Sequence, residues 1–129
     1  MDNWELKECI DLNRMLKVRT DLNLINKEEY PHLIILTHRY ATSDDVLFPE
    51  PSTLGFFATF EEKCLKKLES AIYVAQDIHT GLLGIYIYTY NYKKTIIETI
   101  EHLKQKPEYH VEFKVNSDEN WDIFENLGE

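Results

Sequence analysis

Residues 81–92, GLLGIYIYTYNY, predict the central strand of the fold. Successive side chains of a strand point to opposite faces of its sheet, so this stretch has an aliphatic face and a tyrosine face. The first carries Ile85, Ile87 and Thr89, and the second carries Tyr86, Tyr88 and Tyr90. The aliphatic face suits a core. The tyrosine face needs a cover or a partner, because its rings are apolar while its hydroxyl groups are polar.

Three further strands are predicted around this one. A tight turn at Thr80 and Gly81 joins it to a strand over residues 71–80, which alternates along its length. Residues 32–40 form a strand whose four consecutive aliphatic side chains indicate that both of its faces are covered. Residues 108–116 alternate most clearly and form the last strand.

Two helices are predicted between these strands. Residues 53–70 are helical, and a capping box at Thr59 and Glu62 indicates that the regular helix begins there, after a short turn that Gly55 separates. Residues 93–106 form the second helix, which Pro107 ends. Its inner stripe is expected to hold Ile96, Ile97, Ile100 and Leu103. Residues 41–52, which contain two prolines, are expected to be a loop.

The residues at the N-terminal end are predicted to form a β-hairpin. Residues 4–10 and 15–22 read as strands, and the Asp and Asn within residues 11–13 favour a turn between them. A helix over residues 5–19 is the alternative, because several apolar residues there also have helical spacing.

From residue 32 onward the order is strand, helix, strand, strand, helix, strand. This order predicts an α+β fold of the ferredoxin-like βαββαβ type, with an antiparallel four-stranded sheet and two helices on one face. Strands 32–40 and 82–92 are expected in the middle of the sheet, and strands 71–80 and 108–116 at its edges.

We expect a single domain over residues 1–129, which suits a chain of this length. Its predicted parts are a hairpin extension (1–30), a ferredoxin-like core (31–116) and an acidic tail (117–129). The tail should dock as a short helix or turn through its apolar residues, which are Trp121, Ile123, Phe124 and Leu127.

The net charge of −9 disfavours nucleic-acid binding, because a phosphate backbone repels an acidic chain. The first residues lack the pattern of a signal peptide, and no apolar run is long enough to span a membrane. The two cysteines, Cys9 and Cys64, form no disulfide framework. We therefore expect a cytoplasmic protein with reduced thiols.

The sequence contains no catalytic motif that we recognise. It has no glycine-rich phosphate loop, no nucleophile elbow and no pair of histidines at zinc-binding spacing, so no catalytic residue, metal or cofactor is predicted. The tyrosine face resembles an RNA-recognition surface only in topology, because the basic and glycine residues of that motif are absent. We predict instead an interaction surface made of Tyr86, Tyr88, Tyr90, His38, Tyr40 and His110.

Four stretches carry a resemblance to a known family: EEYPHLIILTHRY, FEEKCLKKLE, IYIYTY after a glycine turn, and DENWDIF. Over about residues 14–127 the chain resembles bacterial proteins of the domain of unknown function 695 family. It is also broadly similar to the regulator of ribonuclease E activity B, an acidic ferredoxin-like protein that binds an enzyme and inhibits it. The shared signs are the acidic charge, the order of elements and the pair Asp118 and Trp121. The resemblance assigns no functional residue.

We expect a non-enzymatic binding or regulatory module that acts through protein–protein contacts. Its contact surface would be the acidic surface, the open sheet face or the loop 41–52, and a basic partner would be attracted by its charge. One alternative is a small-molecule-binding protein or enzyme with a pocket on the open sheet face. Another is a homodimer in which two tyrosine faces pack together.

Overall fold

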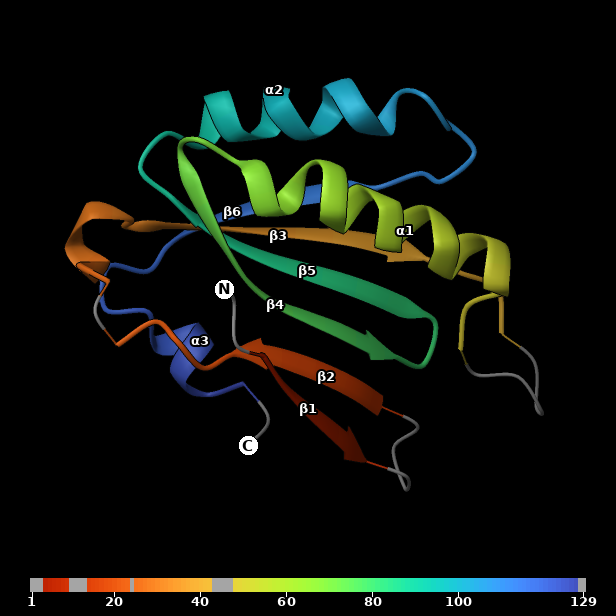
Figure 1. Cartoon of the computed structure of the whole chain (residues 1–129), viewed down its shortest axis with the longest axis horizontal. Coiled ribbons are helices and arrows are strands. Elements are labelled where there is room, and N and C mark those ends of the chain that lie inside the picture. The colour runs from red at the N-terminus through yellow and green to blue at the C-terminus, as the bar shows by residue number, and fades with distance from the viewer. Residues whose placement is uncertain (1–3, 10–13, 24, 43–47, 128–129) are drawn as a thin grey trace.

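The computed structural model describes residues 4–9, 14–23, 25–42 and 48–127 (Figure 1). This part of the chain forms six strands and three α-helices. The strands are β1 (Trp4–Cys9), β2 (Arg14–Arg19), β3 (His32–Arg39), β4 (Ala71–His79), β5 (Leu82–Thr89) and β6 (Glu112–Ser117). The helices are α1 (Pro51–Lys63), α2 (Tyr92–Leu103) and α3 (Asp122–Glu125), with short 3₁₀ helices η2 (Lys27–Glu29) and η3 (Leu65–Lys67).

All six strands belong to one antiparallel sheet in the order β1-β2-β4-β5-β3-β6. The expected neighbours β4-β5-β3-β6 are present, and β5 lies between β4 and β3. The expectation of four strands with 71–80 at an edge is wrong, because β2 pairs with β4 and carries the hairpin into the same sheet. The expected turn at residues 11–13 lies outside the described residues.

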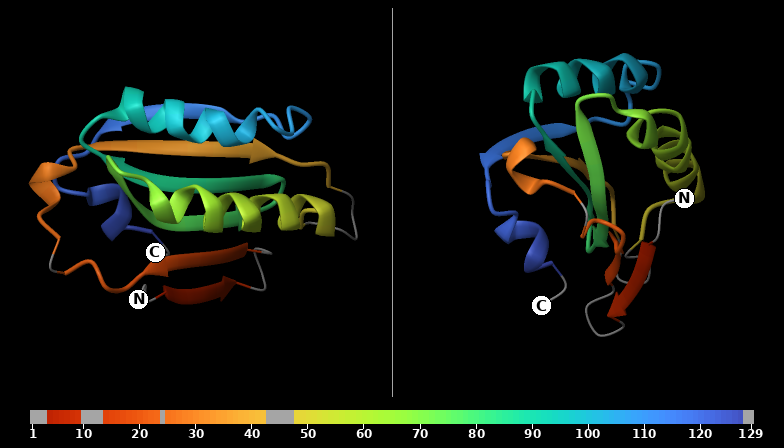
Figure 2. Two further views of the ribbon diagram at one scale, coloured as in Figure 1. Left: turned by 45° about the horizontal axis from the view of Figure 1, so that its top comes forward. Right: turned by 60° about the vertical axis from the view of Figure 1, so that its left-hand side comes forward.

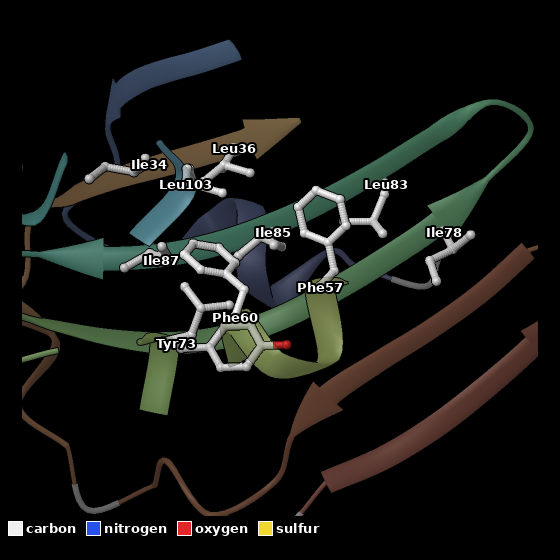
Figure 3. Close-up of a cluster of buried hydrophobic side chains, with 11 residues drawn as sticks. Ile34, Leu36, Phe57, Phe60, Tyr73, Ile78, Leu83, Ile85, Ile87 and Leu103 are labelled. Atoms are coloured by element: carbon white, nitrogen blue, oxygen red, sulfur yellow. The ribbon is translucent and has the colours of Figure 1, made fainter. Parts of the chain in front are cut away.

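α1 and α2 lie along one side of the sheet, and α3 lies on the opposite side (Figures 1 and 2). Ile85 and Ile87 of β5 meet Phe57 and Phe60 of α1 in the first core (Figure 3). All four side chains are buried. The aliphatic face of the central strand is therefore the helix-covered face, as the alternation predicts.

A β-bulge in β4 breaks the alternation expected there. The register shifts between Tyr73 and Ala75, so Tyr73 and Ile78 both join the core under the helices. Val74 and Ala75 both join a second cluster, which involves the tyrosine face. The bulge adds one residue to β4, so beyond the bulge each side chain points to the face opposite to the one that strict alternation predicts.

Helix boundaries also differ from the prediction. α1 begins two residues earlier, with Pro51 in its first turn, where the missing N–H of proline costs nothing. It runs through Gly55 without a break and ends at Lys63, before a single turn of 3₁₀ helix. β6 begins at Glu112, four residues later than expected, because a turn after α2 holds Tyr109.

α2 presents a different face to the core from the one its sequence predicts. Ile97 is 61% exposed and Ile100 is 43% exposed, whereas Thr95 and Thr99 are buried with Leu103. The expected inner stripe is therefore wrong at both isoleucines. The Thr95 hydroxyl oxygen lies 2.8 Å from the Ser70 hydroxyl oxygen, and Ser70 is also buried. Buried hydroxyl groups need such partners, and this hydrogen bond favours the observed rotation of the helix.

Candidate functional site

The tyrosine face is half covered by the C-terminal segment, residues 118–127. Tyr88 is fully buried, and its ring stacks on Trp121 with 4.0 Å between centroids and 11° between planes. Its hydroxyl donates to Asp118 Oδ2 at 2.7 Å and accepts from the Phe124 N–H at 3.2 Å. Burial, and then the bond to Asp118, raises the pKa of Tyr88. The tail docks as predicted, and it removes Tyr88 from any open surface.

Asp118 organises this segment. Besides the Tyr88 hydroxyl, its carboxylate accepts hydrogen bonds from the N–H groups of Asp122 and Ile123, each at 3.0 Å. Trp121 adopts a left-handed conformation with φ 59°, and its ring Nε1 donates to the Tyr30 carbonyl oxygen at 3.0 Å. A left-handed non-glycine residue is held in place by its surroundings, so these contacts fix the cover.

The other half of the tyrosine face forms a shallow hollow around Tyr86. Gly84 lines it together with Asp77 and His79 of the neighbouring strand. Arg14 binds both Asp77 oxygens at 3.0 Å, which is the bidentate geometry of a strong ion pair. The hollow measures about 100 Å³, smaller than the roughly 300 Å³ at which ligand pockets begin. It does not have the size of the expected small-molecule pocket.

Two of the predicted surface residues, His38 and Tyr40, lie on the helix-covered side instead, and the backbone of a third, His110, meets His38 there. His38 is buried, contacts the Phe57 ring and lies with Nδ1 2.7 Å from the His110 carbonyl oxygen. Tyr40 is partly buried against the core under the helices, and burial raises its pKa. His110 itself is exposed beside β6.

The structure therefore does not bring the six predicted residues together. Tyr86 lines the hollow, Tyr88 is buried under the tail, and Tyr90 is 55% exposed against the Tyr30 ring. Of the remaining three, His38 and Tyr40 belong to the other side, and the carbonyl oxygen of His110 lies against His38. The alternation of side chains along β3 explains the separation. Thr37 lies opposite Gly84 and on the same face of the sheet, so the adjacent His38 points to the other face.

A surface that the sequence did not predict lies along α2 and β6. The Glu98 side chain bonds Ser70 on the α1 flank of α2, and helical spacing turns the exposed side chains of Ile97 and Ile100 away from Glu98. The α2 ribbon lies over the part of the sheet formed by β3 and β6 (Figure 2). Val115 of β6 is 37% exposed there. In the described chain β6 pairs only with β3, so its outer backbone edge is free. We call Ile97, Ile100, Val115 and this free edge the edge surface.

A buried polar cluster lies at the opposite end of the sheet, under α1. The Glu61 carboxylate is buried, accepts a hydrogen bond from the Tyr73 hydroxyl and pairs with Lys17. Trp4 packs on Tyr73 with 4.9 Å between ring centroids, and Lys17 lies over the Trp4 ring. Burial, and then the nearby carboxylate, raises the pKa of Tyr73. This cluster attaches the hairpin to α1.

The described residues offer neither a cluster of metal ligands nor a membrane-spanning helix. No group of three or more His, Cys, Asp or Glu side chains there is placed to hold a metal ion. None of the described helices has the length and apolar character needed to cross a membrane.

Comparison with known proteins identifies the family. The sequence model of a family of unknown function, DUF695, matches residues 2–127. The chain belongs to this family. No curated protein and no solved structure matches it. The match confirms the resemblance to this family, but not the broader similarity to the regulator of ribonuclease E activity B, and it brings no activity with it.

Proposed function

We propose that this DUF695 protein is a non-enzymatic binding module that contacts a protein partner through the edge surface. The observation that carries the proposal is the orientation of α2. This helix turns Thr95 and Thr99 inward and leaves Ile97 and Ile100 facing solvent. Exposed apolar side chains gathered at one place typically mark an interaction site.

The free edge of β6 supports the same proposal. An unpaired strand edge offers a row of N–H and C=O groups to a strand of another chain, and peptide recognition by strand addition uses such edges. Val115 lies on this strand opposite Ile34, on the face of the sheet that packs against α2, so an added strand would find an exposed apolar side chain beside its backbone hydrogen bonds. The net charge of −9 favours a partner with a basic surface, because opposite charges speed association.

We further propose that the sheet is a ferredoxin-like unit that the N-terminal hairpin extends at one edge. The order β4-β5-β3-β6 and the position of α1 and α2 on one side of the sheet support this description. With this fold and its acidic charge, the module is suited to inhibit or regulate a basic enzyme by covering part of its surface.

The test is recovery of a stoichiometric partner from lysate of the source cell by the tagged protein, compared with its Ile97→Lys variant. We expect the wild type to retain the partner and Ile97→Lys to lose it, because a charge at the centre of an apolar contact is not solvated. Leu6→Lys is the matched control, since Leu6 is an exposed apolar residue on β1, far from the edge surface.

Two results would overturn the proposal. One is the absence of any stoichiometric partner at several salt concentrations. The other is retention of the partner by Ile97→Lys to the same extent as by Leu6→Lys. Light scattering of the wild type separates a foreign partner from a second copy of the chain, because only a homodimer would show twice the monomer mass without added protein.

A further inference from the structure

A groove between α1 and α2 lies on the flank of α2 that faces away from the edge surface. Its volume is about 430 Å³, within the range of roughly 300 to 1,000 Å³ that is typical of small-molecule sites. One face of α1 lines it from Gly55 to Lys63, and the end of α2 and the following turn line the other side from His102 to Tyr109. Neither the edge surface nor the hollow at Tyr86 shares these residues.

Aromatic rings form the apolar part of the groove. Phe56 and Tyr109 stack with 4.6 Å between centroids and 21° between planes, and the His102 ring lies 6.0 Å from Phe56. Gly55 stands beside them, and a Cβ built on it would meet nothing within 4 Å. An apolar body could therefore lie over Gly55 against the rings without displacing a side chain.

The charged residues in the groove lining are both cationic. Lys63 and Lys106 line it, and no carboxylate does so among the described residues. Neither lysine pairs with a described acid, whereas Lys66 and Lys104, just outside the groove, pair with Glu62 and Glu101. Burial, and then the charge of Lys63, lowers the pKa of His102. Two uncompensated positive charges are unexpected in a chain of net charge −9.

We propose that this groove binds a small organic anion with an aromatic or branched apolar body and a single carboxylate or sulfonate group. The body would pack on Phe56 and Tyr109, and the anionic group would take the two lysines as charge-assisted partners. The His102 ring, which contacts both Phe56 and Phe60, would complete the wall. The site is independent of the proposed protein contact, because it uses the opposite flank of α2.

The experiment is a fluorescence titration with 8-anilinonaphthalene-1-sulfonate, an aromatic anion, and with N-phenyl-1-naphthylamine, a neutral dye of similar shape. We expect saturable binding of one sulfonate dye per chain and at least about fivefold weaker binding of the neutral dye, since it lacks the charged group. The double variant Lys63→Gln, Lys106→Gln should weaken sulfonate binding at least about tenfold. Gly55→Leu, which fills the open space, should abolish it.

Two control variants separate the groove from other apolar surfaces that attract such dyes. Lys66→Gln, Lys104→Gln removes the same charge from outside the groove, and Ile97→Lys alters the edge surface; both should bind the sulfonate dye as the wild type does. Equal binding of the two dyes would overturn the proposal. So would unchanged binding by the lysine variant or by Gly55→Leu, provided that circular dichroism shows the variants folded. Failure of the protein-capture test would leave this result unaffected.

Discussion

Replacement of Tyr88 by phenylalanine removes two of the hydrogen bonds that hold the C-terminal segment on the tyrosine face. The ring can keep its place against Trp121, so the change isolates the hydroxyl group. A hydrogen bond to a charged group contributes about 1.5 to 3 kcal/mol, and the bond to Asp118 is of this kind. Asp118 retains two backbone donors, whereas the Phe124 N–H loses its acceptor. We expect the free energy of unfolding to fall by about 2 kcal/mol.

Thermal unfolding measures this loss. From average values per residue, the entropy of unfolding of 129 residues is about 0.27 kcal/mol/K, so about 2 kcal/mol lowers Tm by about 7 °C. Trp121→Ala should lower the stability more, by about 3 to 5 kcal/mol, because it empties a fully buried site. A loss below about 0.5 kcal/mol for Tyr88→Phe would show that the segment is not held by this bond.

The pH dependence gives an independent check. The pKa of Tyr88 is raised in the folded protein, so its contribution to stability is complete below its unfolded pKa and is lost as the pH rises toward the folded pKa. The pKa of Tyr88 in the unfolded chain is about 10, so the free energy of unfolding of the wild type should fall by about 1.4 kcal/mol more than that of Tyr88→Phe between pH 8 and pH 11. Urea unfolding at both pH values measures the gap between the two proteins, which is the difference in their free energies of unfolding. A gap that stays constant or widens would contradict a buried, neutral Tyr88.

Three further outcomes follow from other positions. Gly55→Ala should raise the free energy of unfolding by about 0.5 to 1 kcal/mol in urea titrations, because glycine is a poor helix former and an added Cβ meets nothing within 4 Å; a lower midpoint would refute this. Burial raises the pKa of Cys64 to about 11. In Cys9→Ser protein at pH 8, Cys64 should therefore react with a disulfide reagent roughly two-hundredfold more slowly in the folded than in the unfolded state. Equal rates in the two states would contradict the burial of Cys64. Glu61→Gln should cost about 1 to 2 kcal/mol in thermal unfolding by weakening the bond to Tyr73 and removing the charge beside Lys17, whereas no change would show that the cluster does not stabilise the hairpin.

Strands were predicted well because alternation is a local signal. The hairpin, the turn at Gly81 and the two faces of β5 all follow from neighbouring residues. The bulge at Tyr73 was not predictable, because one extra residue in a strand leaves no mark on an apolar pattern. The width of the sheet was also missed, since pairing of β2 with β4 joins segments that the sequence separates by the whole of β3 and α1.

The site was less predictable than the fold. Apolar periodicity favoured Ile97 and Ile100 for the core, but the hydroxyl of Thr95 found buried partners in Ser70 and Thr89. Those partners come from other elements, and no window of helical length contains them all. The surface that we propose for protein contact therefore appears only when the rotation of α2 is known. Prediction of the tail was better, since its apolar residues indicated docking and Trp121 is buried.

The burial of Tyr88 under Trp121 also has a consequence for biosynthesis. Trp121 shares a cluster with Leu16 and Leu22, so the second core joins segments that lie far apart in the sequence. Contacts between such distant segments form slowly, and domains complete their folding only when all of their parts are available. Until residues 118–127 have been synthesised, the nascent chain holds a finished strand whose tyrosine has no cover. A chaperone that recognises exposed aromatic surface would meet this protein at that stage, and docking of residues 118–127 would close the face.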